Sequence, residues 1–235
     1  MSVFTPITSE STGDLLADNI RAAILDGRIA PGDRLIEMDL AAQFETSRAP
    51  VREAIRLLSA ERLVQLRRNR GAVVVTPTIE DVLEVYAMRL SLGGIALARA
   101  VEIKSGEHPE FSAARKTLDH MRDPALRADS VAMVDADLAV QSATFALSQL
   151  PRICSALSRT ENEIRFFVTA LGITYDTLDR QAQIERHERV LDAIEAGDAD
   201  AAIATWDTHI QRTIAEFTTT HEFTQVNHAA QGEQS

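Results

Sequence analysis

The chain is poor in cysteine and in aromatic residues, and it has no long apolar run. Its single cysteine, Cys154, rules out a disulfide framework and fits a reducing compartment. Its apolar stretches are all shorter than the roughly 18 residues that span a bilayer. The N-terminus lacks the basic-then-apolar pattern of an export signal. We therefore expect a cytoplasmic protein that has no contact with a membrane.

Net positive charge is concentrated in one segment of this acidic chain. Residues 1–76 contain ten Arg and ten Asp or Glu, so residues 77–235 hold the whole net charge of −11. Within residues 46–71, seven Arg accompany only two acidic residues. This distribution favours a regulator that binds DNA through one small face.

The segment 46–58 has the pattern of a DNA recognition helix. Three guanidinium groups recur every four residues on one face: Arg48, Arg52 and Arg56. The opposite face is apolar and would anchor the helix to its domain. Ser47 can cap the helix, and Pro50 falls in its first turn, where a missing N–H costs little. Such a helix can lie in a major groove while it stays anchored.

The neighbouring segments complete a known architecture. A helical pattern over residues 15–26 ends at Gly27, and a short helix is expected over 37–44. Residues 63–67 and 72–75 have the pattern of two strands around a basic turn. Three helices followed by a β-hairpin predict a winged helix-turn-helix domain over residues 1–76.

Residues 12–76 resemble the DNA-binding domain of the GntR family. The matching elements are Ile20, Ile24-Leu25, Gly27, Ile29, Pro31-Gly32, Leu35, Glu37, Leu40-Ala41, Ser47-Arg48, Pro50-Val51-Arg52-Glu53-Ala54 and Arg70-Gly71. The resemblance implies that Arg48 and Arg52 contact guanine edges or phosphates and that Ser47 contacts a phosphate. It also implies that Gly71 lets the wing approach the minor groove. Some members carry a DNA-contacting Arg where this chain has Met38.

The expected DNA-binding set, which combines the helix pattern with this resemblance, is Ser47, Arg48, Pro50, Arg52, Arg56, Arg70 and Gly71. For Arg56, a solvated helix face is an equally good interpretation.

Beyond Pro77 the pattern is helical throughout. A capping sequence begins one helix at Thr78, and further helices are expected at 109–122, 128–147, 152–171, 177–196 and 200–223. This predicts an all-α antiparallel bundle of about six helices over 77–223, with ligand space between facing helices. The polar residues 224–235 are expected to form a disordered tail.

The bundle resembles the effector domain (FCD type) of the FadR subgroup of GntR regulators. The signals are Tyr86, Arg89, Asp137, His187, Val190-Leu191 and His209. In many members an Asp-x-x-x-His pair and two later histidines bind a divalent metal at the floor of the ligand pocket. Asp137, His187 and His209 match that set, whereas Gln141 stands where the first histidine is expected. The resemblance therefore implies a site for Zn²⁺, Mn²⁺ or Ni²⁺.

Gln141 leaves alternatives open. It shares a helix face with Asp137, so both side chains would enter the same pocket. A carboxylate and two imidazoles suffice to hold a metal, but an amide oxygen is a weaker ligand than imidazole. Either metal binding is weakened, or Gln141, His187 and His209 donate hydrogen bonds to an effector. The remaining interpretation is that these are polar residues paired with their neighbours.

Arg89 is a candidate ligand for a carboxylate effector, because subgroup effectors are often small organic acids. A salt bridge to another helix is the equal alternative. Two consecutive glycines in the same expected helix, Gly93 and Gly94, indicate close helix packing, a kink or room for a ligand.

These observations predict a ligand-responsive transcriptional repressor that binds a pseudo-palindromic, double-stranded DNA operator as a homodimer. The alternatives are an acyl-thioester effector and a C-terminal domain that only dimerises. A metal-dependent enzyme is disfavoured, because the sequence supplies no partnered general base, phosphate loop or nucleophile motif.

Overall fold

The computed structural model describes residues 11–67, 71–103, 108–128, 130–172 and 177–232. The chain forms two compact units, Met1–Thr76 and Pro77–Ser235. Each unit has its own core, and each is described by itself below.

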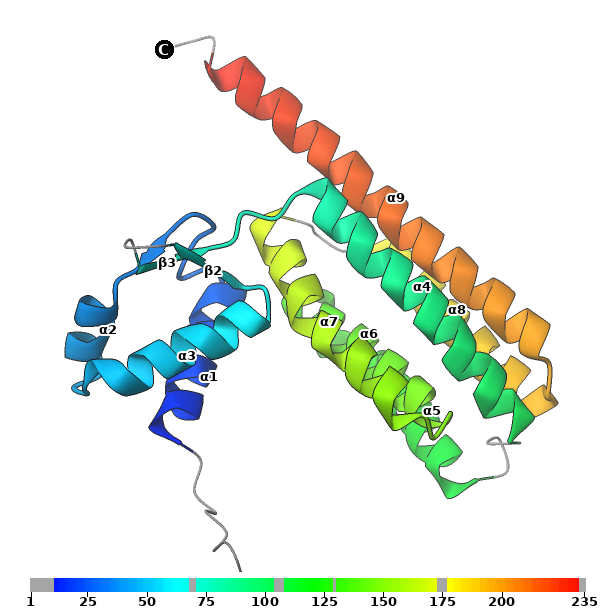
Figure 1. Ribbon diagram of the computed structural model, residues 1–235. Coiled ribbons are helices and arrows are strands. Elements are labelled where there is room, and N and C mark those ends of the chain that lie inside the picture. Colours follow the sequence, from blue (N-terminus) through cyan, green and yellow to red (C-terminus); the bar gives the residue numbers. More distant parts are fainter. Residues whose placement is uncertain (1–10, 68–70, 104–107, 129, 173–176, 233–235) are drawn as a thin grey trace, which may run out of the picture. The chain divides into compact units, whose positions relative to one another are not determined.

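The first unit is a small helical domain with a short sheet (Figure 1). Its described helices are α1 (Thr12–Leu25), α2 (Glu37–Gln43) and α3 (Arg48–Ala60). Its described strands are β1 (Arg34–Leu35), β2 (Val64–Arg67) and β3 (Gly71–Val74), in the antiparallel order β1-β3-β2. Leu35 and Leu66 both pair with Ala72, one from each side of β3. The winged helix-turn-helix is thus confirmed, with a third strand that the sequence pattern did not predict.

Helix α1 supports α3 through an apolar interface. A capping box formed by Ser11 and Asp14 fixes the start of α1. The apolar side chains of the two helices are buried together: Leu16, Ile20 and Ile24 from α1, and Val51, Ile55 and Leu58 from α3. The apolar stripe predicted for α3 therefore anchors it, and the arginine face is left on the outside.

The second unit is the predicted all-helical bundle. Its described α-helices are α4 (Ile79–Glu102), α5 (Pro109–His120), α6 (Ser130–Ala146), α7 (Pro151–Ala170), α8 (Thr177–Ala196) and α9 (Ala199–Gly232). A 3-10 helix, η2 (Pro124–Ala128), precedes α6. Helix α4 packs against α9 and α7, and α8 packs against α9 (Figure 1).

Helix α9 differs from the sequence prediction at its C-terminal end. It continues to Gly232, whereas the polar composition predicts a disordered tail from residue 224. No proline interrupts residues 224–232, and glycine occurs only at the last of them, so the backbone hydrogen-bond ladder has no reason to stop earlier. Residues 233–235 lie outside the described part of the chain.

The two consecutive glycines of α4 have different surroundings. A Cβ at Gly93 would overlap the indole of Trp206 on α9, while a Cβ at Gly94 would meet nothing within 4 Å. The indole Nε1 donates a hydrogen bond of 3.1 Å to the carbonyl oxygen of Arg89. Close helix packing, one of the sequence interpretations, therefore explains Gly93.

Replacing Gly93 by Ala should destabilise the second unit by about 1–3 kcal/mol, because the added methyl group must displace the indole. The matched control, Gly94→Ala, should be neutral or stabilising by up to about 1 kcal/mol, because it adds helix propensity in open space. Trp206 is the only tryptophan, so urea unfolding followed by its fluorescence measures this unit. Equal free energies of unfolding for the two variants would contradict the packing argument.

Candidate functional site

The arginine face of α3 is exposed, as predicted from the sequence. The side chains of Arg48 and Arg52 are 58% and 53% exposed. Arg56 is also exposed and forms an ion pair with Glu53 at 3.6 Å. A groove opens beside α3, and neither Arg56 nor Pro50 is among the residues that line it.

Ser47 occupies the N-cap position of α3 with an extended backbone, but its hydroxyl makes no capping hydrogen bond to this helix. The predicted cap is therefore wrong in this respect. One of the two usual donors to a capping hydroxyl, the N–H three residues on, is missing here. That position is Pro50, which has no N–H. The Ser47 hydroxyl thus remains available to another acceptor or donor.

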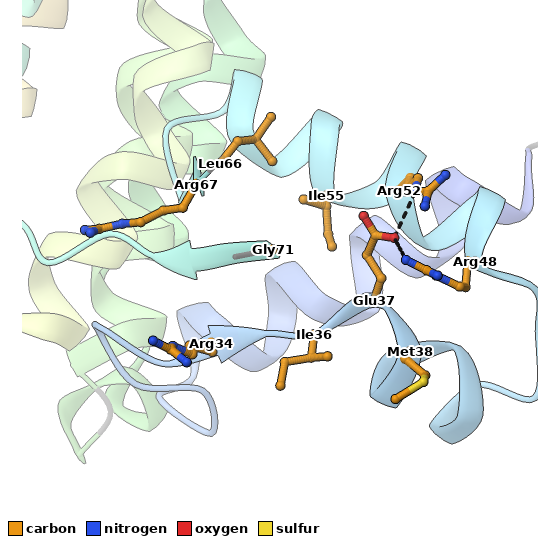
Figure 2. Close-up of a pocket in the computed structure, with 10 residues that line it drawn as sticks. All are labelled: Arg34, Ile36, Glu37, Met38, Arg48, Arg52, Ile55, Leu66, Arg67 and Gly71. Atoms are coloured by element: carbon orange, nitrogen blue, oxygen red, sulfur yellow. Dashed lines mark hydrogen bonds and ion pairs between the residues drawn. The ribbon is translucent and has the colours of Figure 1, made fainter. Parts of the chain in front are cut away.

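A groove of about 790 Å³ opens beside α3 (Figure 2). Its walls come from the strands, from the start of α2 and from α3: Arg34, Ile36, Glu37, Met38, Arg48, Arg52, Ile55, Leu66, Arg67 and Gly71. Four guanidinium groups therefore share one concave surface with exposed apolar side chains. Among the latter, Met38 is 66% exposed.

Glu37 joins the two arginines of this groove. Its Oε2 accepts a hydrogen bond of 2.9 Å from Arg48 and one of 2.8 Å from Arg52 Nε. Burial alone would raise the pKa of this carboxyl, but the two guanidinium hydrogen bonds outweigh it and lower the pKa below its usual range. The sequence pattern contained Glu37 only as a motif residue, and its role was missed.

The second strand of the wing, β3, begins at a glycine whose backbone conformation favours that residue. Gly71 has φ +73°, and a Cβ there would lie 3.0 Å from the carbonyl oxygen of Leu35. Arg70, which the sequence assigns to the DNA-binding set, lies outside the described residues. Arg34 and Arg67 line the groove although the sequence did not select them. Arg34 was missed because the two-residue strand β1 is too short to show an alternating pattern.

In the second unit, three helices bring the predicted triad together. Asp137 of α6, His187 of α8 and His209 of α9 are buried, and their potential ligand atoms all lie within 4.8 Å of one another. His187 Nε2 is 2.6 Å from Asp137 Oδ1. The centroids of the two imidazole rings are 5.0 Å apart.

Gln141 is oriented by two polar contacts. Its Oε1 accepts a hydrogen bond of 2.5 Å from Arg89, and its Nε2 donates one of 2.7 Å to Asp137 Oδ2. The Nε2 is also 3.4 Å from His209 Nε2. Gln141 therefore presents N–H groups to the triad and keeps its oxygen for Arg89. In this orientation it is a hydrogen-bond donor beside the triad and not a fourth metal ligand.

Arg89 is a fully buried cation held by neutral groups. Besides Gln141, its guanidinium donates to the Leu157 carbonyl at 3.1 Å and to the Thr160 hydroxyl at 2.6 Å. Within the described part of the chain no salt bridge reaches it, and its Nε has no hydrogen-bond partner. The salt-bridge interpretation is thus not met by these residues. Burial lowers the pKa of Arg89.

Burial and neighbouring charges shift the pKa of two groups at this centre. Burial lowers the pKa of His209 to about 3, so its imidazole is neutral at physiological pH, and it stacks on Trp206 at 5.2 Å. Burial raises the pKa of Asp137, but the hydrogen bond and charge of His187 outweigh this and lower it overall. One carboxylate and two imidazoles form a donor set that suits Zn²⁺, Mn²⁺ or Ni²⁺ at three positions.

Family comparisons agree with both units. Residues 12–74 match the model of the bacterial regulatory proteins of the gntR family, and residues 84–212 match the FCD domain. The chain belongs to the GntR-family regulators that carry an FCD domain. No helix of the described residues is long and apolar enough to cross a membrane.

Two curated relatives illustrate the similarity. The gluconate operon transcriptional repressor of Bacillus subtilis (strain 168) is 39% identical over 97 residues, which are 41% of this chain and 40% of the repressor. That match thus spans less than two thirds of the relative. A Paenarthrobacter nicotinovorans protein, named for repression of a D-xylose utilization operon, is 27% identical over 83% of this chain and 84% of its own length.

Solved structures share the fold of both units. A GntR transcriptional regulator from Rhodococcus sp. RHA1 has a TM-score of 0.71 at 27% identity, covering 89% of this chain and 99% of that one. E. coli McbR/YncC has a TM-score of 0.72 at 19% identity, covering 91% and 100%. The two curated relatives and the Rhodococcus protein are described as transcriptional regulators, and the family model that matches the first unit is that of bacterial regulatory proteins.

Replacing Gln141 by His should tighten Zn²⁺ binding by roughly 10- to 100-fold, because a third imidazole, as the fourth ligand, replaces an N–H donor that competes for Asp137. Isothermal titration with Zn²⁺ measures the change. Gln149→His, which adds an exposed imidazole in the turn after α6, is the control and should leave the affinity unchanged. Tight binding that survives loss of both His187 and His209 would locate the metal elsewhere.

Proposed function

We propose that this GntR-family protein is a repressor of the FadR subgroup, whose FCD domain binds a small organic acid and thereby changes its affinity for an operator. The observation that carries the effector assignment is Arg89, a buried guanidinium that forms no salt bridge among the described residues. The charges of Glu161 and Asp137 reach it only from beyond salt-bridge distance. Burying a charge that has no directly paired counter-ion is expensive. A ligand carboxylate would supply a direct one.

On the DNA side, Arg48 and Arg52 are proposed to contact base edges or phosphates, with the free Ser47 hydroxyl on a phosphate. Their support is exposure on one side of α3, beside a groove that Gly71 of the wing also lines. One recognition helix reads only half of a pseudo-palindrome, so a homodimer is the proposed active form. Exposed apolar side chains on α4, Met88 and Ile95, offer a surface that a second copy could cover.

In the FCD domain, Arg89 is proposed to bind the effector carboxylate, with Gln141, His187 and His209 as polar neighbours. Asp137, His187 and His209 would hold a divalent metal. Such a cation would supply further positive charge to a bound carboxylate. Effector binding would favour one of two arrangements of the protein. These two arrangements would differ in their affinity for the operator.

Arg52→Ala should weaken binding to a specific operator by at least about tenfold, because a bidentate arginine contact contributes about 1–3 kcal/mol. The operator is a duplex selected by the wild-type protein from a random library, and gel-shift titration gives the Kd. Arg99→Ala, which removes an exposed arginine from the second unit, should bind like the wild type. An unchanged Kd for Arg52→Ala would refute the assignment of α3 as the DNA recognition helix.

The effector proposal can be tested with pairs of ligands. Short mono- and dicarboxylic acids are each compared with the amide that lacks the negative charge, and a bound acid should raise the melting temperature where its amide does not. Arg89→Lys should weaken the active acid at least about tenfold, because lysine lacks the planar fork. Arg152→Lys, a substitution of an exposed arginine at the start of α7, is the control.

Each other outcome of this screen has a meaning. An acid that protects Arg89→Lys as well as wild type would place its carboxylate elsewhere. If no acid raises the melting temperature, the result would favour a C-terminal domain that only dimerises. If acyl thioesters alone raise it, the effector belongs to that class.

A further inference from the structure

The carboxylate of Glu37 points toward two of the arginines that line the groove, Arg48 and Arg52 (Figure 2). Its side chain is only 23% exposed, whereas Arg48 and Arg52 are each more than half exposed. A single oxygen, Oε2, accepts from both guanidinium groups. The carboxylate therefore joins the start of α2 to two successive turns of α3.

These hydrogen bonds restrict where the arginines can reach. A free arginine side chain populates many rotamers and can follow any nearby phosphate. When both guanidiniums share one anchor, their remaining N–H groups are held over the groove, and neither has another hydrogen bond to a described residue. Side chains that are ordered before binding lose less entropy when they meet a base edge.

Glu37 also changes the local charge. It places one negative charge among two positive ones, so the pair attracts phosphates less strongly than two free arginines would. Phosphate attraction supplies essentially all nonspecific binding, and base contacts supply specificity. A carboxylate that orients guanidiniums while it weakens their phosphate attraction should therefore disfavour nonspecific complexes more than specific ones.

We propose that Glu37 is a positioning residue that sets the ratio of specific to nonspecific DNA affinity by holding Arg48 and Arg52 over the groove. This inference rests on the proposed DNA contacts of those two arginines. Glu37 would thus affect the discrimination between specific and nonspecific DNA, and not the affinity for DNA in general.

The test compares Glu37→Gln with Asp39→Asn in the full chain. Asp39 is an exposed acid in the same first turn of α2, so its loss removes the same charge from the same helix terminus without touching the arginines. Fluorescence anisotropy gives Kd values at several salt concentrations for a duplex selected by the wild type and for a scrambled duplex. Thermal melting checks that both variants fold.

For Glu37→Gln we expect the specificity ratio to fall about tenfold. Binding to scrambled DNA should strengthen, with a salt slope steeper by roughly 0.9. Asp39→Asn should keep the wild-type ratio. An equal fall in both variants, or no fall in Glu37→Gln, overturns the proposal.

A third variant separates charge from geometry. Glu37→Asp keeps the charge but is one methylene shorter, so it cannot hold both guanidiniums in the same way. It should show the wild-type salt slope and a lowered specificity ratio. A specificity ratio equal to that of the wild type would mean that only the charge of residue 37 matters, and would contradict a positioning role. Failure here is distinguishable from failure of the proposed function, because in the latter case Arg52→Ala would itself leave operator binding intact.

Discussion

The second unit is organised around one buried cation, the guanidinium of Arg89. Arg89 lies on α4, and it donates to Gln141 of α6 and to Leu157 and Thr160 of α7. Its backbone carbonyl accepts from the indole of Trp206 on α9. Four helices are therefore joined at one residue, through partners that are all neutral. Because buried charges need partners, every group around Arg89 is constrained in where it can point.

The orientation of the polar centre follows from this constraint. Since Arg89 takes the oxygen of Gln141, the amide nitrogen must face Asp137 and His209. Gln141, which stands where the family pattern has a histidine, thus removes an imidazole ligand and adds an N–H donor. Both weaken the centre as a metal site and leave it polar and suited to hydrogen bonding. An effector carboxylate at Arg89 would compete with Gln141 and could release the amide.

Sequence periodicity was sufficient to predict the helices, and a family pattern was needed to predict which polar residues they bring together. The helix expected over 177–196 has those bounds in the structure, and the apolar stripe of α3 is buried against α1. The triad was found because the residue types and their order along the chain matched a family pattern. Its internal contacts could not be predicted, because the rotamer of Gln141 depends on an arginine 52 positions away.

Two of the errors originate in contacts between elements, and one is local to a single helix. The local error is the cap expected from Ser47, which the structure lacks. Pro50, three residues on, has no N–H and so removes one of the two usual donors. The strand β1 has only two residues and exists because β3 lies beside it. Glu37 precedes Arg48 by eleven positions, a spacing that is meaningful only once α2 and α3 have packed together.

Both units use an acceptor on a neighbouring helix to orient arginine, but with opposite electrostatic consequences. At Glu37 the acceptor is a carboxylate near solvent, where water weakens the charge interaction and the guanidiniums stay accessible. At Gln141 the acceptor is a neutral amide in the interior, so the charge of Arg89 has no direct counter-ion among the described residues. An anion that reached Arg89 would meet that charge where water screens it least. The same side chain therefore suits a solvated polyanion in one unit and a small desolvated anion in the other.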